Sequence, residues 1–186
     1  MPLQIERRIF DVDEYHRMAD AGILSEDDRV ELIEGEIIMM SPIGRRHAAE
    51  VNRLTARFHQ WLGQAAMVSV QNPIKLDDHS EPQPDIALLK PCADFYEHSN
   101  LEIDDILLII EVADSSLDFD RKVKIPLYAG KGIEEAWIVN LPEDVIEIYA
   151  DARNGKYEKF RTAHRGEILT PLRIPSLSIP VKDILG

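Results

Sequence analysis

The chain of 186 residues has the length at which one hydrophobic core is usual, so we expect a single domain over residues 1–186. Hydrophobic residues make up 45% and charged residues 30%, which is ordinary for a globular domain. No apolar run approaches the roughly 20 residues that span a bilayer, which excludes a membrane-spanning helix. No signal peptide is visible, and the single cysteine, Cys92, cannot form an internal disulfide. These features predict a cytoplasmic protein.

The formal net charge of −13 opposes a nucleic-acid partner. Phosphate binding draws on Lys and Arg, so such a partner would need a local basic patch or a bound metal ion. The basic cluster that we find comprises Arg45, Arg46, Arg53 and Arg57, with His47 nearby. A solvated charged helix face explains this cluster equally well.

Apolar periodicity and turn signals predict an alternation of helices and strands. In chain order we expect a helix over 11–22, two short strands within 30–40, a helix over 45–62, strand candidates at 67–76, 85–89 and 106–112, a helix over about 119–131, a strand at 136–140, and a hairpin of 145–150 with 157–161. Residues 172–185 contain prolines and are expected to form irregular edge structure. This order predicts an α/β fold with a mixed central sheet flanked by helices.

Three local signals support particular boundaries. Asp11 and Glu14 have the spacing of a capping box at a helix start. Pro126 is costly in a helix interior and therefore predicts a kink or a later start of the helix at 119–131. The pair Asn154-Gly155 supplies the positive φ angles that a tight hairpin turn requires.

Two acids at the margins of apolar strands suggest a metal site. Asp85 begins one apolar segment and Glu111 ends another. Residues 90–105 show no clear crossover helix, so antiparallel pairing is the simpler assumption, and it would bring both acids to one edge of the sheet. A divalent cation would offset their repulsion and burial, and carboxylate oxygens suit Mg²⁺ or Mn²⁺. Alternatively, Asp85 caps a turn after Pro84 and Glu111 pairs with a lysine.

An ordered set of motifs carries a resemblance to a known family. The motifs are Glu31 to Ile37, His47, Pro84-Asp85, Glu111-Val112, Asp120 to Ala129 and Gly132 to Asn140. Each motif is weak alone, but the set resembles the Uma-two family of restriction-endonuclease-like proteins, which is grouped in the PD-(D/E)XK nuclease superfamily. The resemblance covers roughly residues 10–149 and implies a restriction-endonuclease-like (PD-(D/E)XK) core.

The resemblance implies that Asp85 and Glu111 bind the metal, and we expect the carbonyl of Val112 to help them. The superfamily pattern places a lysine two residues after the second acid, but this position is Ala113. The resemblance therefore implies that the lysine has moved to the following helix, where Lys124 is the better candidate.

The spacing of Asp120, Lys124 and Tyr128 places them on one helical face, which favours Lys124 as the site lysine. Lys122, on a different face, is the runner-up. Without the resemblance, a surface ion pair between Asp120 and Lys124 would explain the spacing.

His47 matches the histidine that the family usually carries, which implies a role near the metal or the scissile phosphate. Otherwise it is a solvated side chain or a partner of Glu50. Glu50 resembles, more weakly, the acid that several superfamily members carry on their first helix.

We therefore expect an enzyme, a Mg²⁺-dependent endonuclease that hydrolyses phosphodiester bonds in DNA. One alternative is a catalytically silent nuclease-fold module for binding or assembly, which the alanine at position 113 and the charge of −13 favour. Another is a metal-dependent hydrolase of a small phosphorylated molecule, which suits an acidic protein. Superfamily members often dimerise, so a homodimer is expected by analogy only.

Overall fold

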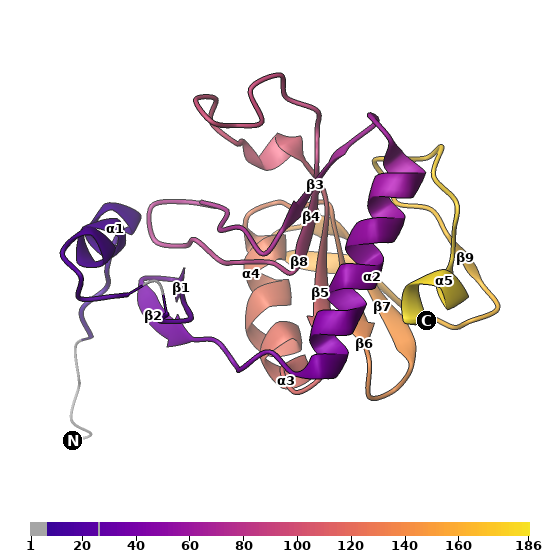
Figure 1. Cartoon of the computed structure of the whole chain (residues 1–186), viewed down its shortest axis with the longest axis horizontal. Coiled ribbons are helices and arrows are strands. Elements are labelled where there is room, and N and C mark those ends of the chain that lie inside the picture. The colour runs from indigo at the N-terminus through magenta and orange to yellow at the C-terminus, as the bar shows by residue number, and fades with distance from the viewer. Residues whose placement is uncertain (1–6, 26) are drawn as a thin grey trace. The chain divides into compact units, whose positions relative to one another are not determined.

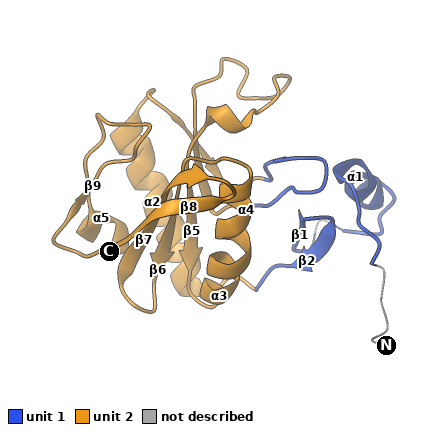
Figure 2. Cartoon of the chain, turned by 180° about the vertical axis from the view of Figure 1, so that it is seen from behind, with its two compact units in different colours: residues 1–41, 73–83 blue, residues 42–72, 84–186 orange. Residues whose placement is uncertain are grey.

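The computed structural model describes residues 7–25 and 27–186, and its contacts group the chain into two compact units (Figure 2). Unit 1 combines the N-terminal segment up to residue 41 with residues 73–83. Unit 2 comprises residues 42–72 and 84–186. The expectation of one domain over residues 1–186 stays a prediction.

Unit 1 contains helix α1 (Val12–Asp20) and the antiparallel strands β1 (Val30–Ile33) and β2 (Glu36–Met39). The capping box is confirmed, because the Glu14 N–H donates to the Asp11 carboxylate at 2.7 Å and the Asp11 N–H donates to Glu14 at 3.3 Å. Glu34 and Gly35, with φ angles of 49° and 77°, form the turn between the strands. The predicted helix and two-stranded ribbon are therefore both present.

Unit 2 is built on a six-stranded sheet in the order β3-β4-β5-β6-β7-β8. Its strands are β3 (Met67–Val70), β4 (Ile86–Leu89), β5 (Ile106–Ala113), β6 (Glu135–Asn140), β7 (Val145–Arg153) and β8 (Lys156–Ala163). β5 and β6 run parallel, whereas the other neighbouring strands are antiparallel. The mixed central sheet that the sequence predicts is therefore confirmed.

The remaining elements of unit 2 surround this sheet. They are α2 (Arg45–Leu62), the 3₁₀ turn η1 (Ile103–Asp105), α3 (Leu117–Phe119), the π-helical turn η2 (Asp120–Lys124), α4 (Ile125–Gly130), the paired short strands β9 (Ile168–Leu169) and β10 (Ile179–Pro180), and α5 (Val181–Leu185).

Helices cover both faces of the sheet in unit 2, and Figure 1 shows α2 and α4 on opposite sides of it. The apolar face of α2 contributes Leu54 and Phe58 to a core that also contains Ile110 and Trp137 of the sheet. Each side chain of this size stabilises the fold by roughly 1.5–3 kcal/mol when it is fully buried. Every residue of β5 is buried, as its continuous apolar run predicts for a strand that is covered on both sides.

Three segments differ from the sequence prediction. The strand expected over 67–76 ends at Val70, because Gln71 adopts a φ angle of 50° and Pro73 cannot donate to a strand ladder. The helix expected over 119–131 begins at Leu117 and is interrupted by η2, where the Ile125 N–H donates to the carbonyl of Asp120. Pro126 is at the start of α4, directly after η2, so the proline follows the π-helical turn within one continuous helical segment and no later start is present. The expectation of irregular structure over 172–185 is wrong at its C-terminal end, where β10 and α5 form and bury apolar residues. Both elements are too short to show a readable period.

Candidate active site

Asp85 and Glu111 lie side by side at one end of the sheet in unit 2. In the antiparallel pairing of β4 with β5, Ile86 stands opposite Ile110. Asp85, which precedes Ile86, therefore lies beside Glu111, which follows Ile110. The Asp85 N–H points to Oε2 of Glu111 at 3.3 Å, and the Val112 N–H donates to Oδ2 of Asp85 at 2.9 Å. The expected juxtaposition of the two acids is therefore present, while their role as metal ligands stays a prediction.

Asp85 is held as a carboxylate by three neighbouring groups. Nε2 of His47, on the first turn of α2, lies 2.9 Å from Oδ2, and the side-chain amide of Gln71 donates to Oδ1 at 3.1 Å. Burial alone would raise the pKa of Asp85, but the hydrogen bonds from His47, Val112 and Gln71 hold the pKa below its ordinary value. The structure thus brings His47 to Asp85, where it can stabilise and orient an ionised ligand.

Gln71 is a site residue that the sequence analysis missed. β3 pairs with β4 in an antiparallel register in which Val70 stands opposite Ile86, so Gln71 lies opposite Asp85. Its backbone N–H donates to the Asp85 carbonyl at 3.1 Å, and its φ angle is 50°, in a region that side chains other than Gly, Asn and Asp rarely adopt. The assumption that β3 and β4 pair as adjacent antiparallel strands would have identified Gln71 as a neighbour of Asp85.

Glu111 is contacted by two side chains from the following helical segment. Nζ of Lys124 lies 3.3 Å from Oε1, and the hydroxyl of Tyr128 donates to the same oxygen at 2.5 Å. Burial, together with the carboxylates of Asp120 and Asp85, raises the pKa of Glu111 to about 8, although Lys124 and Tyr128 act in the opposite direction. The pKa values of the two central acids are therefore driven apart, a pattern common in active sites.

The structure distinguishes the two candidate lysines. Lys124 and Asp120 are both buried, so the interpretation of this pair as a surface ion pair is wrong. The side chain of Lys122 is 71% exposed and pairs with Asp118 at 2.9 Å. Lys124 is thus the candidate lysine that contacts Glu111, and Tyr128, one helical turn further along, contacts the same carboxylate. Ala113, the position of the superfamily lysine, is buried and carries no amine.

The donor set at this site fits a hard cation that keeps water in its coordination sphere. Two carboxylates with adjacent backbone groups suit Mg²⁺ or Mn²⁺, since Mg²⁺ is commonly held by one or two carboxylates plus waters. Over residues 7–25 and 27–186, the structure forms no group of three or more His, Cys, Asp and Glu side chains arranged to hold a metal ion. Burial, followed by the carboxylates of Asp120 and Asp85, raises the pKa of Glu111, and a cation at this site would favour its ionised form.

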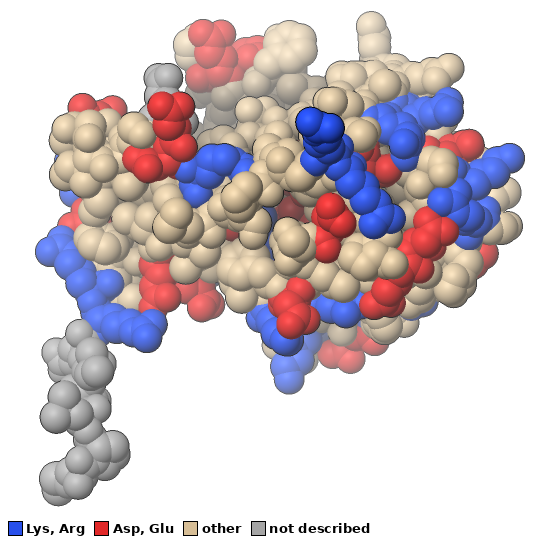
Figure 3. Space-filling model, turned by 60° about the horizontal axis from the view of Figure 1, so that its bottom comes forward, with Lys and Arg blue, Asp and Glu red and all other residues tan. Residues whose placement is uncertain are grey.

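Two of the four arginines of the predicted basic cluster, Arg46 and Arg53, make contacts within the protein. Arg46 donates to the Leu141 carbonyl at 2.5 Å, and Arg53 donates to Glu50 at 2.6 Å. Glu50 is buried beside Arg53, and none of its described contacts joins it to Asp85 or Glu111. On the face seen in Figure 3, Lys and Arg side chains alternate with Asp and Glu, so no extended basic surface is visible there.

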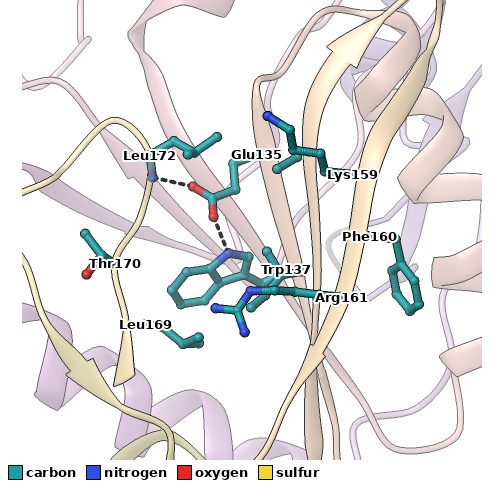
Figure 4. A pocket seen from close by; sticks show the side chains of 10 residues that line it. Glu135, Trp137, Lys159, Phe160, Arg161, Leu169, Thr170 and Leu172 are labelled. Atoms are coloured by element: carbon teal, nitrogen blue, oxygen red, sulfur yellow. Dashed lines mark hydrogen bonds between the residues drawn. The ribbon is translucent and has the colours of Figure 1, made fainter. Parts of the chain in front are cut away.

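Unit 2 also has a cavity of about 230 Å³ that is separate from the paired carboxylates (Figure 4). Glu135 lies against it and accepts hydrogen bonds from the indole of Trp137 at 2.7 Å and from the Leu172 N–H at 2.6 Å. The cavity is lined by Glu135, Trp137, Ile148, Ala150, Lys159, Phe160, Arg161, Leu169, Thr170 and Leu172. None of these residues belongs to the candidate site, so this cavity is not its substrate pocket.

The sheet order, the flanking helices and the paired acids define a restriction-endonuclease-like fold. A crystal structure described as a putative nuclease belonging to DUF820, from Anabaena variabilis, is similar, with a TM-score of 0.70 and 17% sequence identity over 95% of this chain and 97% of that chain. Residues 12–182 match the Uma2 family, described as "Putative restriction endonuclease", and the chain belongs to this family. No match was found among curated proteins.

Family and fold together support a nuclease, and restriction-endonuclease-like proteins generally use divalent metals. Among residues 7–25 and 27–186, no helix combines the length and apolarity needed to cross a membrane.

Proposed function

We propose that this protein is a Mg²⁺-dependent endonuclease that hydrolyses phosphodiester bonds in DNA. The observation that carries the proposal is the meeting of Asp85 and Glu111 on adjacent strands, with the buried ammonium of Lys124 3.3 Å from Glu111. Two acids and a lysine in one place are the groups that metal-assisted phosphodiester hydrolysis requires. The cytoplasmic location and the homodimer stay predictions from the sequence.

Asp85 and Glu111 would hold the cation, helped by the carbonyl of Val112. When bound, Mg²⁺ would polarise the scissile phosphate and make a coordinated water more acidic. Lys124 would orient the attacking water and offset the negative charge that develops on the phosphate oxygens. His47 and Gln71 keep Asp85 ionised and oriented, and Tyr128 fixes Glu111 through its hydroxyl. These supporting contacts are of the kind that tune metal affinity.

The net charge of −13 bears on substrate affinity rather than on the chemistry. A cation between the two carboxylates would let an acidic site approach a phosphate, although it would not supply affinity along a DNA groove. We therefore expect weak binding to DNA that falls further as salt concentration rises.

The test compares the purified wild type with the isosteric variants Asp85→Asn and Glu111→Gln, on plasmid DNA and on RNA, with Mg²⁺ or Mn²⁺. Asp144→Asn serves as a matched control because Asp144 is an exposed acid paired with Arg165. We expect the wild type and the control to cleave DNA and both site variants to be inactive. Cleavage that survives in both site variants would place the chemistry elsewhere.

The two alternative functions predict different results in the same experiment. A hydrolase of small phosphorylated molecules would leave plasmid DNA intact and act on a panel of small phosphoesters in a manner that depends on Asp85. A catalytically silent module would show neither activity, and calorimetry would detect no binding of Mn²⁺.

A further inference from the structure

Glu111 shares a row across the sheet of unit 2 with a second buried carboxylate, Glu147. In the strand registers, Glu111 of β5 stands opposite Ile138 of β6, which in turn stands opposite Glu147 of β7. Opposite residues share a face of the sheet, so both carboxylates point to the side that η2 and α4 cover. Two strand spacings, about 10 Å, separate them.

Glu147 is 2% exposed and accepts hydrogen bonds from three side chains. The Nε of Arg121 donates to Oε2 at 3.0 Å, and a terminal nitrogen of the same guanidinium donates to Oε1. The amide of Asn140 and the hydroxyl of Tyr149 complete the set, at 2.8 Å and 2.7 Å. Burial alone would raise the pKa of Glu147, but these donors hold the pKa below its ordinary value. Glu147 is therefore an anion that forms charged hydrogen bonds with Arg121.

Arg121 and Lys124 belong to the same π-helical turn, η2, and they reach the two glutamates of this row. Arg121 pairs with Glu147, and Lys124 lies beside Glu111. π-Helical turns are rare, and they are held by surrounding contacts and are frequent at functional sites. The two-point hydrogen bonding of a guanidinium to a carboxylate fixes direction as well as distance. Arg121 and Glu147 therefore tie η2 to β7.

We propose that Arg121 and Glu147 form a positioning pair that holds η2 in register over the sheet and thereby places Lys124 against Glu111. Neither residue has a described contact with Asp85 or Glu111. Arg121 lies within the motif Asp120 to Ala129 but was given no role there, and Glu147 lies outside the motifs. The catalytic consequence rests on the proposed function, whereas the placement of Lys124 can be measured without any activity.

The first measurement is the chemical reactivity of Lys124 toward limiting N-hydroxysuccinimide acetate, quantified by mass spectrometry, with the exposed Lys122 as an internal reference. In the wild type, we expect Lys124 to be acetylated far more slowly than Lys122, because its side chain is 5% exposed. In Glu147→Gln, local opening of η2 should raise the rate at Lys124 roughly tenfold and leave Lys122 unchanged.

Two further variants keep this measurement interpretable. Arg121→Lys retains the positive charge but loses the two-point contact, and since Arg121 is partly exposed we expect this variant to fold and to show the same increase at Lys124. Asp144→Asn breaks an exposed arginine–carboxylate pair of similar geometry outside η2, and Lys124 should stay as protected as in the wild type. Protection of Lys124 in both Glu147→Gln and Arg121→Lys would overturn the proposal.

The second measurement tests the consequence for cleavage of plasmid DNA with Mg²⁺. We expect Glu147→Gln to lower kcat by roughly 10- to 100-fold, the scale expected for a misplaced catalytic group, with KM and the Mn²⁺ affinity close to the wild type. In a Lys124→Ala background the same substitution should cause no further loss, because Glu147 acts through Lys124.

An equal further loss in the Lys124→Ala background, or a parallel loss of Mn²⁺ affinity, would assign Glu147 a general structural role and overturn the proposal. If the wild type cleaves no nucleic acid, the proposed function fails, and the acetylation of Lys124 still decides whether the pair positions it.

Discussion

The ammonium of Lys124 lies 3.3 Å from Oε1 of Glu111, and both side chains are at least 95% buried. Despite this neighbour, burial and the carboxylates of Asp120 and Asp85 raise the pKa of Glu111 to about 8. One ammonium therefore does not compensate the acids gathered at this site. A protein that keeps such a carboxylate in its interior gives up stability there, and acids of this kind cluster at functional sites.

Glu111→Gln should stabilise the protein at neutral pH. Because the pKa of Glu111 is about 8 in the fold against an ordinary 4.5, the folded state retains a proton that the unfolded state releases. The free energy of unfolding should therefore fall as pH rises from about 5 to 8. Each unit of pKa difference corresponds to about 1.4 kcal/mol, so after allowance for relaxation of a buried site we expect a gain of about 2 kcal/mol at pH 8.

Urea unfolding of the wild type and of Glu111→Gln between pH 5 and pH 8 measures this effect. Glu147→Gln is the opposite case, because its carboxylate has a lowered pKa and its removal should destabilise the protein at neutral pH. A Glu111→Gln variant that is less stable than the wild type at pH 8 would contradict the assignment of a strained carboxylate.

Lys124→Met should abolish most cleavage while Lys122→Met leaves it near the wild-type level. Lys124 is buried beside Glu111, whereas Lys122 pairs with Asp118 at the surface. Loss of one group that stabilises developing charge costs roughly 100- to 1,000-fold in kcat. Rates of plasmid cleavage under single-turnover conditions test this, with Mn²⁺ affinity measured in parallel to show that the metal site persists. Equal activity of the two variants would remove Lys124 from the mechanism.

Much of the fold and part of the candidate site could be predicted from local patterns. The apolar run at 106–112 predicted a strand covered on both faces, and the lack of a crossover helix between Asp85 and Glu111 predicted the antiparallel pairing that brings the two acids together. Helical spacing predicted that Lys124 and Tyr128 share a face, and both contact Glu111. These features depend on periodicity within one element or on a single strand pairing.

Other features depend on registers that local patterns do not contain. Gln71 reaches Asp85 because the antiparallel register of β3 with β4, in which Val70 stands opposite Ile86, places the next residue of β3 opposite Asp85, and no residue of β3 signals this pairing. Arg121 meets Glu147 across 26 residues of sequence and through the alignment of three strands. The π-helical turn forms from a sequence that also suits an ordinary helix, so tertiary contacts decide its geometry.

Gly155→Ala should destabilise the hairpin of β7 and β8. Asn154 and Gly155 have φ angles of 50° and 76°, which confirms the turn that the sequence predicts. A methyl group on Gly155 would meet no atom closer than 3.9 Å, so the penalty should come from backbone conformation alone and amount to about 1 kcal/mol. Gly166→Ala is the matched control, because Gly166 has open space around it and no positive φ angle. Thermal unfolding should distinguish the two, and an equal effect would contradict a strained turn.

His47→Ala should weaken metal binding without disturbing the fold. Nε2 of His47 lies 2.9 Å from Oδ2 of Asp85, and this contact is the first of those that keep the pKa of Asp85 below its ordinary value. Without it, Asp85 loses both orientation and part of its stabilisation as an anion, so we expect Mn²⁺ affinity to fall roughly tenfold, as for other residues that support a ligand. Calorimetric titration with Mn²⁺ at pH 7 measures the change.

His59→Ala provides the control on the same helix, since His59 is exposed near the opposite end of α2. This variant should bind Mn²⁺ as the wild type does. Unchanged affinity in His47→Ala, with Asp85→Asn abolishing binding, would confine His47 to a structural role or to a contact with substrate.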